Sequence, residues 1–468
     1  MQVEGKRLIK AGLAYVIGSF FSQGLRFITL PIFSRIMLPA DYGYIASYEL
    51  WISILTILVG LQTSATVVNA YIDYGERKID RYTSSVSSLG FISFIICSIV
   101  TVAFSNRISS FLELNIKFLM AGIIQSLCFY YINMLTSKYR VIDNVRGFLA
   151  FNIGHTSLSI LISFIFVINF SIDKYAGYIL GFFASQLLVG LIAGILIYLK
   201  GKCILEKNMN LYAIKLSYPL ILHSAASVIS SKLNQLLLLK MIDATNAGIY
   251  NFTNNFALII TGLYTAFNNA YVPWYFRQLH AGNKKEVEVG SKTYISIFTF
   301  CVSCIIMIMP ETIMIMGSKE YHFAINIVPI LILSTYINFL YTFCVNYEFY
   351  NKKTIYIAAG TLLAAFCNVL LNVILIKYKG IIGATIATCL AASILMAFHY
   401  VITKKVIKGF ELNFNIFLQN IIFVSIIVLM YYYLINRMLI RFAIIAIMII
   451  FLGYKGLKAF RGFTNKNR

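Results

Sequence analysis

Charged residues are scarce in this chain. Asp, Glu, Lys and Arg make up 12 % of its 468 residues, whereas hydrophobic types make up 60 %. Soluble domains carry about 25 % charged and roughly 45–50 % apolar residues. The composition therefore argues against a soluble enzyme. The abundance of Phe, Tyr and aliphatic residues also excludes a disordered chain.

Acidic residues are the scarcer of the two charged classes, which leaves a strongly basic protein. The chain has 17 Asp and Glu against 39 Lys and Arg, a net charge of +22. In a soluble protein this excess would suggest a nucleic-acid partner. In a membrane protein it has a simpler cause, because cytoplasmic loops collect Lys and Arg. We therefore expect contacts with membrane lipids and no binding to nucleic acid.

Signatures of catalysis and of metal binding are missing as well. The sequence contains neither a GxxxxGK[ST] loop for ATP nor an HExxH zinc motif. Most of the eight cysteines lie in apolar runs, so the Cys301–Cys304 spacing is interpreted as two small hydrophobic side chains one helical turn apart. We expect no cofactor, no metal site and no enzymatic activity.

Long apolar stretches, in contrast, occupy most of the chain. A membrane-spanning helix needs about 20 mainly apolar residues. The sequence accordingly predicts an all-α polytopic membrane protein with 14 transmembrane helices. The predicted spans are 11–37, 44–69, 83–104, 114–136, 147–170, 175–199, 211–242, 248–276, 294–316, 325–350, 354–376, 380–403, 414–435 and 440–457.

The distribution of Lys and Arg predicts the orientation of these spans. If the N-terminus is cytoplasmic, most of the 39 basic residues fall in cytoplasmic segments. Among them, Arg26, Lys215 and Lys232 lie within predicted spans. A basic bias over short loops sets the orientation of a membrane protein. We expect both termini on the cytoplasmic side.

One segment of the sequence occurs twice. Residues 34–44 align with residues 239–249, which places Gly43 on Gly248. A second match at nearly the same offset precedes spans six and twelve. Two matches in order indicate a duplicated six-helix unit, as in transporters built from parallel repeats.

This duplication predicts the domain organisation. Residues 1–206 form an N-terminal six-helix half and residues 207–409 a C-terminal one, arranged around a central cavity. Residues 410–468 then hold spans 13 and 14 with a basic cytoplasmic tail.

Four motifs connect this arrangement to a known family. They are 35–43 (Arg35-Ile-Met-Leu-Pro-Ala-Asp-Tyr-Gly43), 266–277, 347–353 and 380–388. Through them, residues 1–409 resemble the polysaccharide-export branch of the multidrug/oligosaccharidyl-lipid/polysaccharide (MOP) flippase superfamily, the Wzx-type O-antigen and capsule flippases. Many members of that branch have twelve helices, so the additional pair of helices is a departure.

The resemblance implies a function and a location. It implies a flippase in the bacterial inner membrane that moves undecaprenyl-pyrophosphate-linked oligosaccharide, an O-antigen or capsule repeat unit, by alternating access. H+ or Na+ would drive the cycle, and glycosyltransferases and a polysaccharide polymerase are candidate partners. Two alternatives stay open. One is a multidrug exporter of the same superfamily, and the other is a membrane enzyme that acts on lipid-linked sugars.

Two cations within predicted spans are candidates for binding the pyrophosphate. Arg26 and Lys232 lie at nearly the same distance from the repeated glycine, in the first helix of each half. Ionisable residues inside a bilayer are costly and default to functional candidates. Arg35 is a further candidate, and snorkelling or local pairing of the cations is the alternative. Asn254, Asn255, Asn268 and Asn269 are candidates for contacts with sugar hydroxyls.

Other polar residues are candidates for ion coupling and bending. Glu49 is the carboxylate predicted well inside the bilayer, either as a proton or cation site or in an ion pair with Arg26 or Arg35. His155 and His223 are candidates for coupling, with helix packing as the alternative. Pro31 and Pro219 are candidate hinges, although static kinks explain them equally well.

Overall fold

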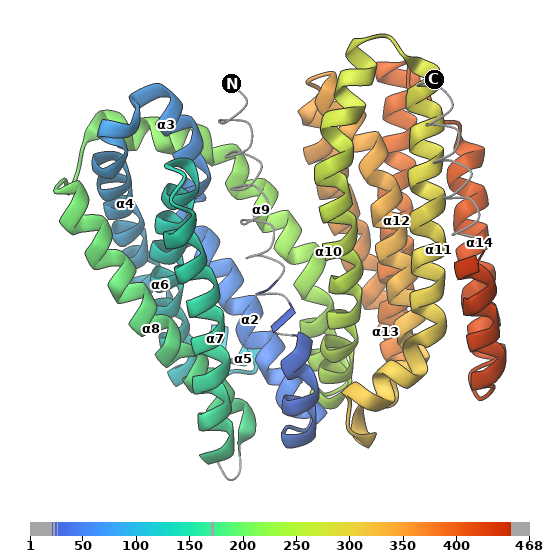
Figure 1. The fold of residues 1–468 in the computed structure, drawn as a ribbon. Helices are drawn as coiled ribbons and strands as arrows, with labels where there is room; N and C mark the ends of the chain where they lie inside the picture. Colours follow the sequence, from blue (N-terminus) through green and yellow to red (C-terminus); the bar gives the residue numbers. More distant parts are fainter. Residues whose placement is uncertain (1–20, 22–23, 26, 170–172, 451–468) are drawn as a thin grey trace. The chain divides into compact units, whose positions relative to one another are not determined.

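The computed structural model describes residues 21, 24–25, 27–169 and 173–450. These residues form helices joined by short connections, and none of them lies in a strand. The prediction of an all-α fold is confirmed (Figure 1). The helices are α2 (Pro39–Gly60), α3 (Val67–Tyr74), α4 (Glu76–Ala103), α5 (Ser105–Leu112), α6 (Ile116–Val141), α7 (Val145–Asn169), α8 (Lys174–Gly201), α9 (Lys207–Met241), α10 (Ala244–His280), α11 (Lys284–Met316), α12 (Ala324–Tyr350), α13 (Thr354–Val401) and α14 (Phe414–Tyr433).

Most of these helices are long and apolar enough to cross a membrane. Nine helices in the described part of the chain meet both conditions, and two shorter apolar helices cover Phe27–Ile36 and Met438–Ile450. The chain is therefore a multi-pass membrane protein. The number of 14 spans stays a prediction, because spans 1 and 14 extend beyond the described residues.

The longest helix contains a backbone break. α13 covers the predicted spans 354–376 and 380–403 in one element, but Gly380 within it has φ 57° and ψ −137°. A residue with a Cβ rarely adopts such a positive φ, whereas glycine does so readily. Gly380 therefore divides α13 into two helical segments at the position where the sequence predicted a loop.

The chain divides into two compact units. The first unit is Met1–Asn251 and the second is Phe252–Arg468, so the boundary falls inside α10. In the first unit, α9 packs against α2 and α4. In the second unit, α12 packs against α11, α13 and α14 and is buried over most of its length. The duplicated halves with a boundary at 206/207 stay a prediction.

The two copies of the repeated motif meet within the first unit. A Cβ atom on Gly43 of α2 would collide with the carbonyl oxygen of Ala244, and one on Gly248 of α10 would collide with that of Pro39. Pro39 and Ala244 are equivalent positions in the alignment of the repeat, so the contact is reciprocal. Only glycine permits this close approach of two backbones. The repeated glycines are thus explained by packing.

The acidic residue of the same motif fixes helix ends. One oxygen of the Asp41 carboxylate accepts a hydrogen bond from the backbone N–H of Leu38 at 2.9 Å, and the other accepts from Tyr175 at 3.1 Å. These N–H groups lie at the N-termini of α2 and α8, where helices leave donors unpaired. Asp41 therefore ties together the starts of two helices that are distant in sequence.

Candidate functional site

A charged pair joins α2 to α9 in the first unit. The Nζ atom of Lys232 donates a hydrogen bond to Oε2 of Glu49 at 2.5 Å. The two side chains retain 29 % and 37 % of their exposure, respectively. Both residues were predicted to lie within spans, but their pairing was not predicted. The exposure matters because an ion or a ligand can reach a half-buried pair without unfolding the helices.

A row of hydrogen-bonded polar side chains, the polar seam, continues from this pair along α9 to the start of α10. Gln235 donates from Nε2 to Oδ1 of Asn251 at 3.1 Å, and Asn234 donates from Nδ2 to the Tyr250 hydroxyl at 3.1 Å. Asn251 in turn donates to the carbonyl oxygen of Tyr42 at 3.2 Å. Asn234 and Gln235 are buried, and buried amides need such partners. The seam leads from Lys232 to the crossing of the repeated glycines.

Arg26 and Arg35 are the candidate cations in the first predicted span. Arg26 lies outside the described residues. Arg35 is exposed, and its Nη1 atom donates to the carbonyl oxygen of Pro31 at 2.9 Å, within the Phe27–Ile36 helix. The side chain of Lys232, the third candidate cation, is placed beside the membrane carboxylate of Glu49. The roles of all three in substrate binding stay predictions.

The four candidate asparagines lie on α10 in the second unit. Asn268 accepts a hydrogen bond at Oδ1 from Nδ2 of Asn346 on α12, at 3.2 Å. Asn255 donates to the carbonyl oxygen of Phe252 at 3.4 Å, one turn earlier in its own helix. Asn254 is partly buried and Asn269 is exposed. Asn269 is therefore the most accessible of the four to a sugar hydroxyl.

His155 lies in a polar contact between α7 and α8. Its Nε2 atom is in hydrogen-bonding contact with Nε2 of Gln186, which also donates to the Ser159 hydroxyl at 3.2 Å. The Ser185 hydroxyl donates to that of Ser159 at 3.0 Å. This geometry fits the helix-packing alternative, and ion coupling by His155 stays a prediction. His223 falls within α9, but its side chain lies outside the described residues.

The candidate hinges lie inside helices. Pro219 is an interior residue of α9, and Pro31 lies in the Phe27–Ile36 helix. Proline removes one backbone hydrogen bond, and a membrane helix tolerates this where neighbouring groups compensate. Each helix continues through its proline, so bending at these residues during transport stays a prediction.

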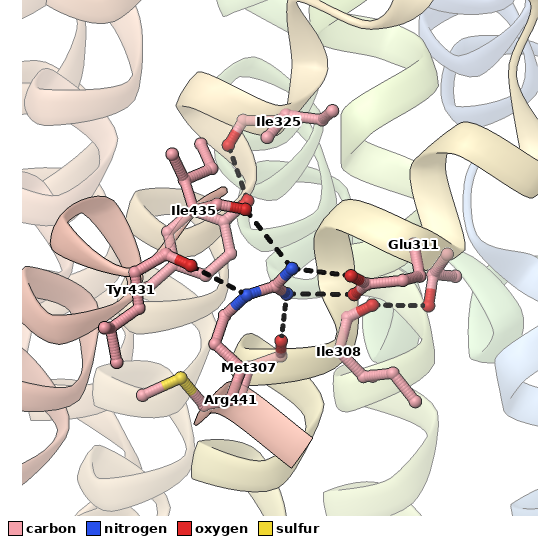
Figure 2. A network of polar contacts seen from close by, with 9 residues as sticks. Met307, Ile308, Glu311, Ile325, Tyr431, Ile435 and Arg441 are labelled. Atoms are coloured by element: carbon pink, nitrogen blue, oxygen red, sulfur yellow. Dashed lines mark hydrogen bonds and ion pairs between the residues drawn. The ribbon is translucent and has the colours of Figure 1, made fainter. Parts of the chain in front are cut away.

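Two pairs of an acid and a base between apolar helices of the second unit were also not predicted from the sequence. His399 of α13 contacts Glu348 of α12 at 2.7 Å between Nδ1 and Oε1, and both side chains are fully buried. Arg441 of the Met438–Ile450 helix pairs with Glu311 of α11 (Figure 2). The signal was present in the sequence, because each pair places an acid and a base in two different apolar runs.

Comparisons with known proteins identify the family. A family model described as "Polysaccharide biosynthesis protein" matches residues 8–279, more than half of the chain. The chain belongs to the polysaccharide biosynthesis protein family. This chain is also 23 % identical over 423 residues to a Haemophilus influenzae protein described as an uncharacterized membrane protein. The match covers 85 % of this chain and 98 % of that protein.

Solved structures show which fold this polysaccharide biosynthesis protein has. It resembles the lipid II flippase MurJ in an inward closed conformation, with a TM-score of 0.73, 16 % identity and coverage of 96 % of this chain and 99 % of that one. It also resembles an inward-facing multidrug resistance MATE family transporter of the MOP superfamily, with a TM-score of 0.67, 13 % identity and coverage of 81 % and 94 %. The resemblance to the MOP superfamily is confirmed, and the fold is that of its transporters.

Proposed function

We propose that this polysaccharide biosynthesis protein is a flippase for undecaprenyl-pyrophosphate-linked oligosaccharide, an O-antigen or capsule repeat unit. The observation that carries the proposal is the likeness of nearly the whole chain to a lipid II flippase, in a protein whose family model describes polysaccharide biosynthesis. Lipid-linked sugars combine a polyprenyl chain, a pyrophosphate and a polar glycan, and each part needs a different environment during transport.

The pair formed by Glu49 and Lys232 supplies a step in the proposed cycle. A pyrophosphate is an anion that competes with a carboxylate for a nearby ammonium group. Because the pair is partly exposed, the substrate can take over Lys232 and so remove this cation from the Glu49 carboxylate. A carboxylate that loses its counterion in a medium of low polarity binds a proton more readily. Arg26 is proposed to contact the same pyrophosphate.

This exchange couples substrate binding to an ion gradient. Glu49 takes up H+, or a Na+ ion in its place, while the substrate holds Lys232. When the substrate leaves, the two side chains pair again and the proton or ion is released. The cycle thus needs no nucleotide and fits the alternating-access mechanism of parallel-repeat transporters.

The proposed location is the bacterial inner membrane, with both termini in the cytoplasm. The excess of Lys and Arg in the loops of one side supports this orientation. Cytoplasmic glycosyltransferases would supply the substrate, and a polysaccharide polymerase on the other side would consume the product.

Export of cationic drugs is the second candidate function, since a MATE family transporter shares the fold. Cation exporters of that kind usually need acids inside the membrane, whereas Glu348 and Glu311 of the second unit are already paired with His399 and Arg441. In the first unit, the membrane carboxylate Glu49 is already paired with Lys232. A membrane enzyme is less well supported, because the loops predicted on the outer side are short.

Reconstitution into liposomes tests the proposal. We expect the purified protein to move a fluorescent undecaprenyl-pyrophosphate oligosaccharide from one leaflet to the other, measured by quenching of the exposed leaflet with dithionite. Ethidium efflux from the same liposomes measures drug export. Transport of ethidium without movement of the lipid-linked sugar would contradict the flippase proposal and favour the exporter.

A further inference from the structure

A surface depression lies at the C-terminal end of α10 in the second unit. It has a volume of about 400 Å³ and is lined by Phe276, Arg277, His280, Ala281 and Tyr350. Volumes of roughly 300–1,000 Å³ are typical of sites for small ligands. Two of the motifs that connect the chain to its family, 266–277 and 347–353, converge on this depression. The residues of these motifs that line the depression have no role in the proposed transport cycle.

The walls of the depression are fixed by local structure. After α10, the backbone N–H of Ala281 donates to the carbonyl oxygen of Arg277 at 3.0 Å, and Gly282 has a positive φ of 73°. This glycine ends the helix sharply. The rings of Phe276 and Tyr350 pack edge to face, with centroids 5.5 Å apart. The end of α10 is thereby held against the end of α12.

The charges of the depression are of one sign. Arg277 and His280 lie about one helical turn apart and are both exposed, and no carboxylate lines the depression. Within the part of the chain that the structure describes, Arg277 forms no ion pair. Lys352 and Lys353 follow two and three residues after Tyr350 and add to the positive potential. An unpaired guanidinium is well suited to bind phosphate through two parallel hydrogen bonds.

The aromatic walls indicate a ligand at the membrane surface. Tyrosine has an apolar ring and a polar hydroxyl and is enriched at the level of the lipid headgroups, which fits Tyr350 at this depression. We propose that this depression binds the phosphate headgroup of a polyprenyl lipid, with Arg277 and His280 on the phosphate and the rings of Phe276 and Tyr350 against the first part of the chain. The lipid class rests on the proposed function. The site would hold the headgroup at the surface of the second unit.

Binding in nanodiscs of neutral phosphatidylcholine tests this site. Undecaprenyl phosphate is titrated into nanodiscs that contain the full chain, and native mass spectrometry gives the bound fraction. We expect Arg277→Ala to weaken binding by about tenfold, as the loss of hydrogen bonds to a charged group predicts. Arg277→Lys should lie between, because lysine keeps the charge but loses the planar fork.

A matched control separates a site from a general attraction. Lys285 is exposed, lies just beyond the same helix end and does not line the depression. Lys285→Ala removes the same charge and should change the affinity by less than about twofold, since an exposed charge outside the site is screened by salt. Equal affinity of Arg277→Ala and the wild type would overturn the proposal, as would an equal loss with Lys285→Ala. An unchanged unfolding temperature of each variant confirms that it is folded.

Competition with inorganic pyrophosphate tests whether the site binds a lipid headgroup or a free phosphate anion from solution. It should compete with the lipid only weakly, because it lacks a chain to contact the aromatic walls. If it binds as tightly as undecaprenyl phosphate, the site takes soluble anions and the lipid assignment is wrong. The assay requires no transport, so failure of the flippase proposal and failure of this site give different results.

Discussion

The first unit has a charged pair between Glu49 and Lys232, and the second unit has one between Glu311 and Arg441. Each pair joins two helices through a carboxylate and a cation. In the first pair, Lys232 contacts Glu49 at 2.5 Å and both side chains remain partly exposed. In the second pair, two Arg441 nitrogens bind the two Glu311 oxygens at 2.9 and 2.5 Å, and Arg441 is 2 % exposed.

The surroundings of the two pairs differ as well. The guanidinium of Arg441 also donates to the carbonyl oxygens of Met307, Leu434 and Ile435, at 2.7, 3.1 and 3.2 Å (Figure 2). These contacts use its donors fully and connect α11 with the connection after α14. A saturated, buried pair stabilises one arrangement of helices, whereas a partly exposed pair can exchange partners. A membrane ion pair is therefore a functional candidate only when a competing ion or ligand can reach it.

The largest effect on stability is expected at Arg441. Arg441→Ala removes the cation from Glu311 and one donor from each of three carbonyl groups, and breaking a buried pair in this way costs roughly 3–5 kcal/mol. Thermal unfolding in detergent and the amount of protein in the membrane measure the loss. Arg437→Ala is the matched control, because Arg437 is an exposed arginine one turn earlier. A similar unfolding temperature for both variants would contradict the structural role of Arg441.

The largest effect on transport is expected at Lys232. Lys232→Ala should reduce flipping of the lipid-linked sugar by about tenfold or more, because a charged contact to the pyrophosphate is lost. Protein levels should be preserved, since the side chain is not fully buried. Lys215→Ala is the control, as Lys215 is an exposed lysine on the same helix. Normal transport by Lys232→Ala would mean that the pair, although accessible, does not bind substrate.

A neutral replacement of the acid separates coupling from binding. Glu49→Gln keeps the shape of the side chain but cannot exchange a proton. We expect it to bind the substrate while its transport no longer responds to pH or to Na+, unlike that of the wild type. Flux measured over a range of pH and sodium concentrations tests this. A response that matches the wild type would show that the coupling group lies elsewhere.

The smallest effect is expected from exchanging the charges of the first pair. The double variant Glu49→Lys with Lys232→Glu keeps an ion pair between α2 and α9. Its unfolding temperature should therefore stay close to that of the wild type. The corresponding exchange of Glu311 and Arg441 should destabilise strongly, because glutamate cannot donate to the carbonyl groups. Equal behaviour of the two double variants would remove the distinction between the pairs.

Most of the architecture followed from local sequence signals. Apolar runs longer than about 20 residues predicted nearly every long helix, because a membrane offers no other partner for backbone N–H and C=O groups. The motif around Gly43 also indicated a repeated structural role. Its cause was not visible in the sequence, since the collision that excludes a Cβ comes from Ala244, on another helix.

The sequence by itself determined the chemical types inside the membrane, because the hydrophobic pattern assigns a charged residue such as Glu49 or Lys232 to a span. Only the tertiary structure decided which charge meets which. Residues 49 and 232 are far apart in the chain, and their distance depends on how α2 packs against α9. The same packing leaves this pair partly exposed while the contacts of α11 bury Arg441. Burial and partner choice are properties of helix packing, and no local pattern encodes them.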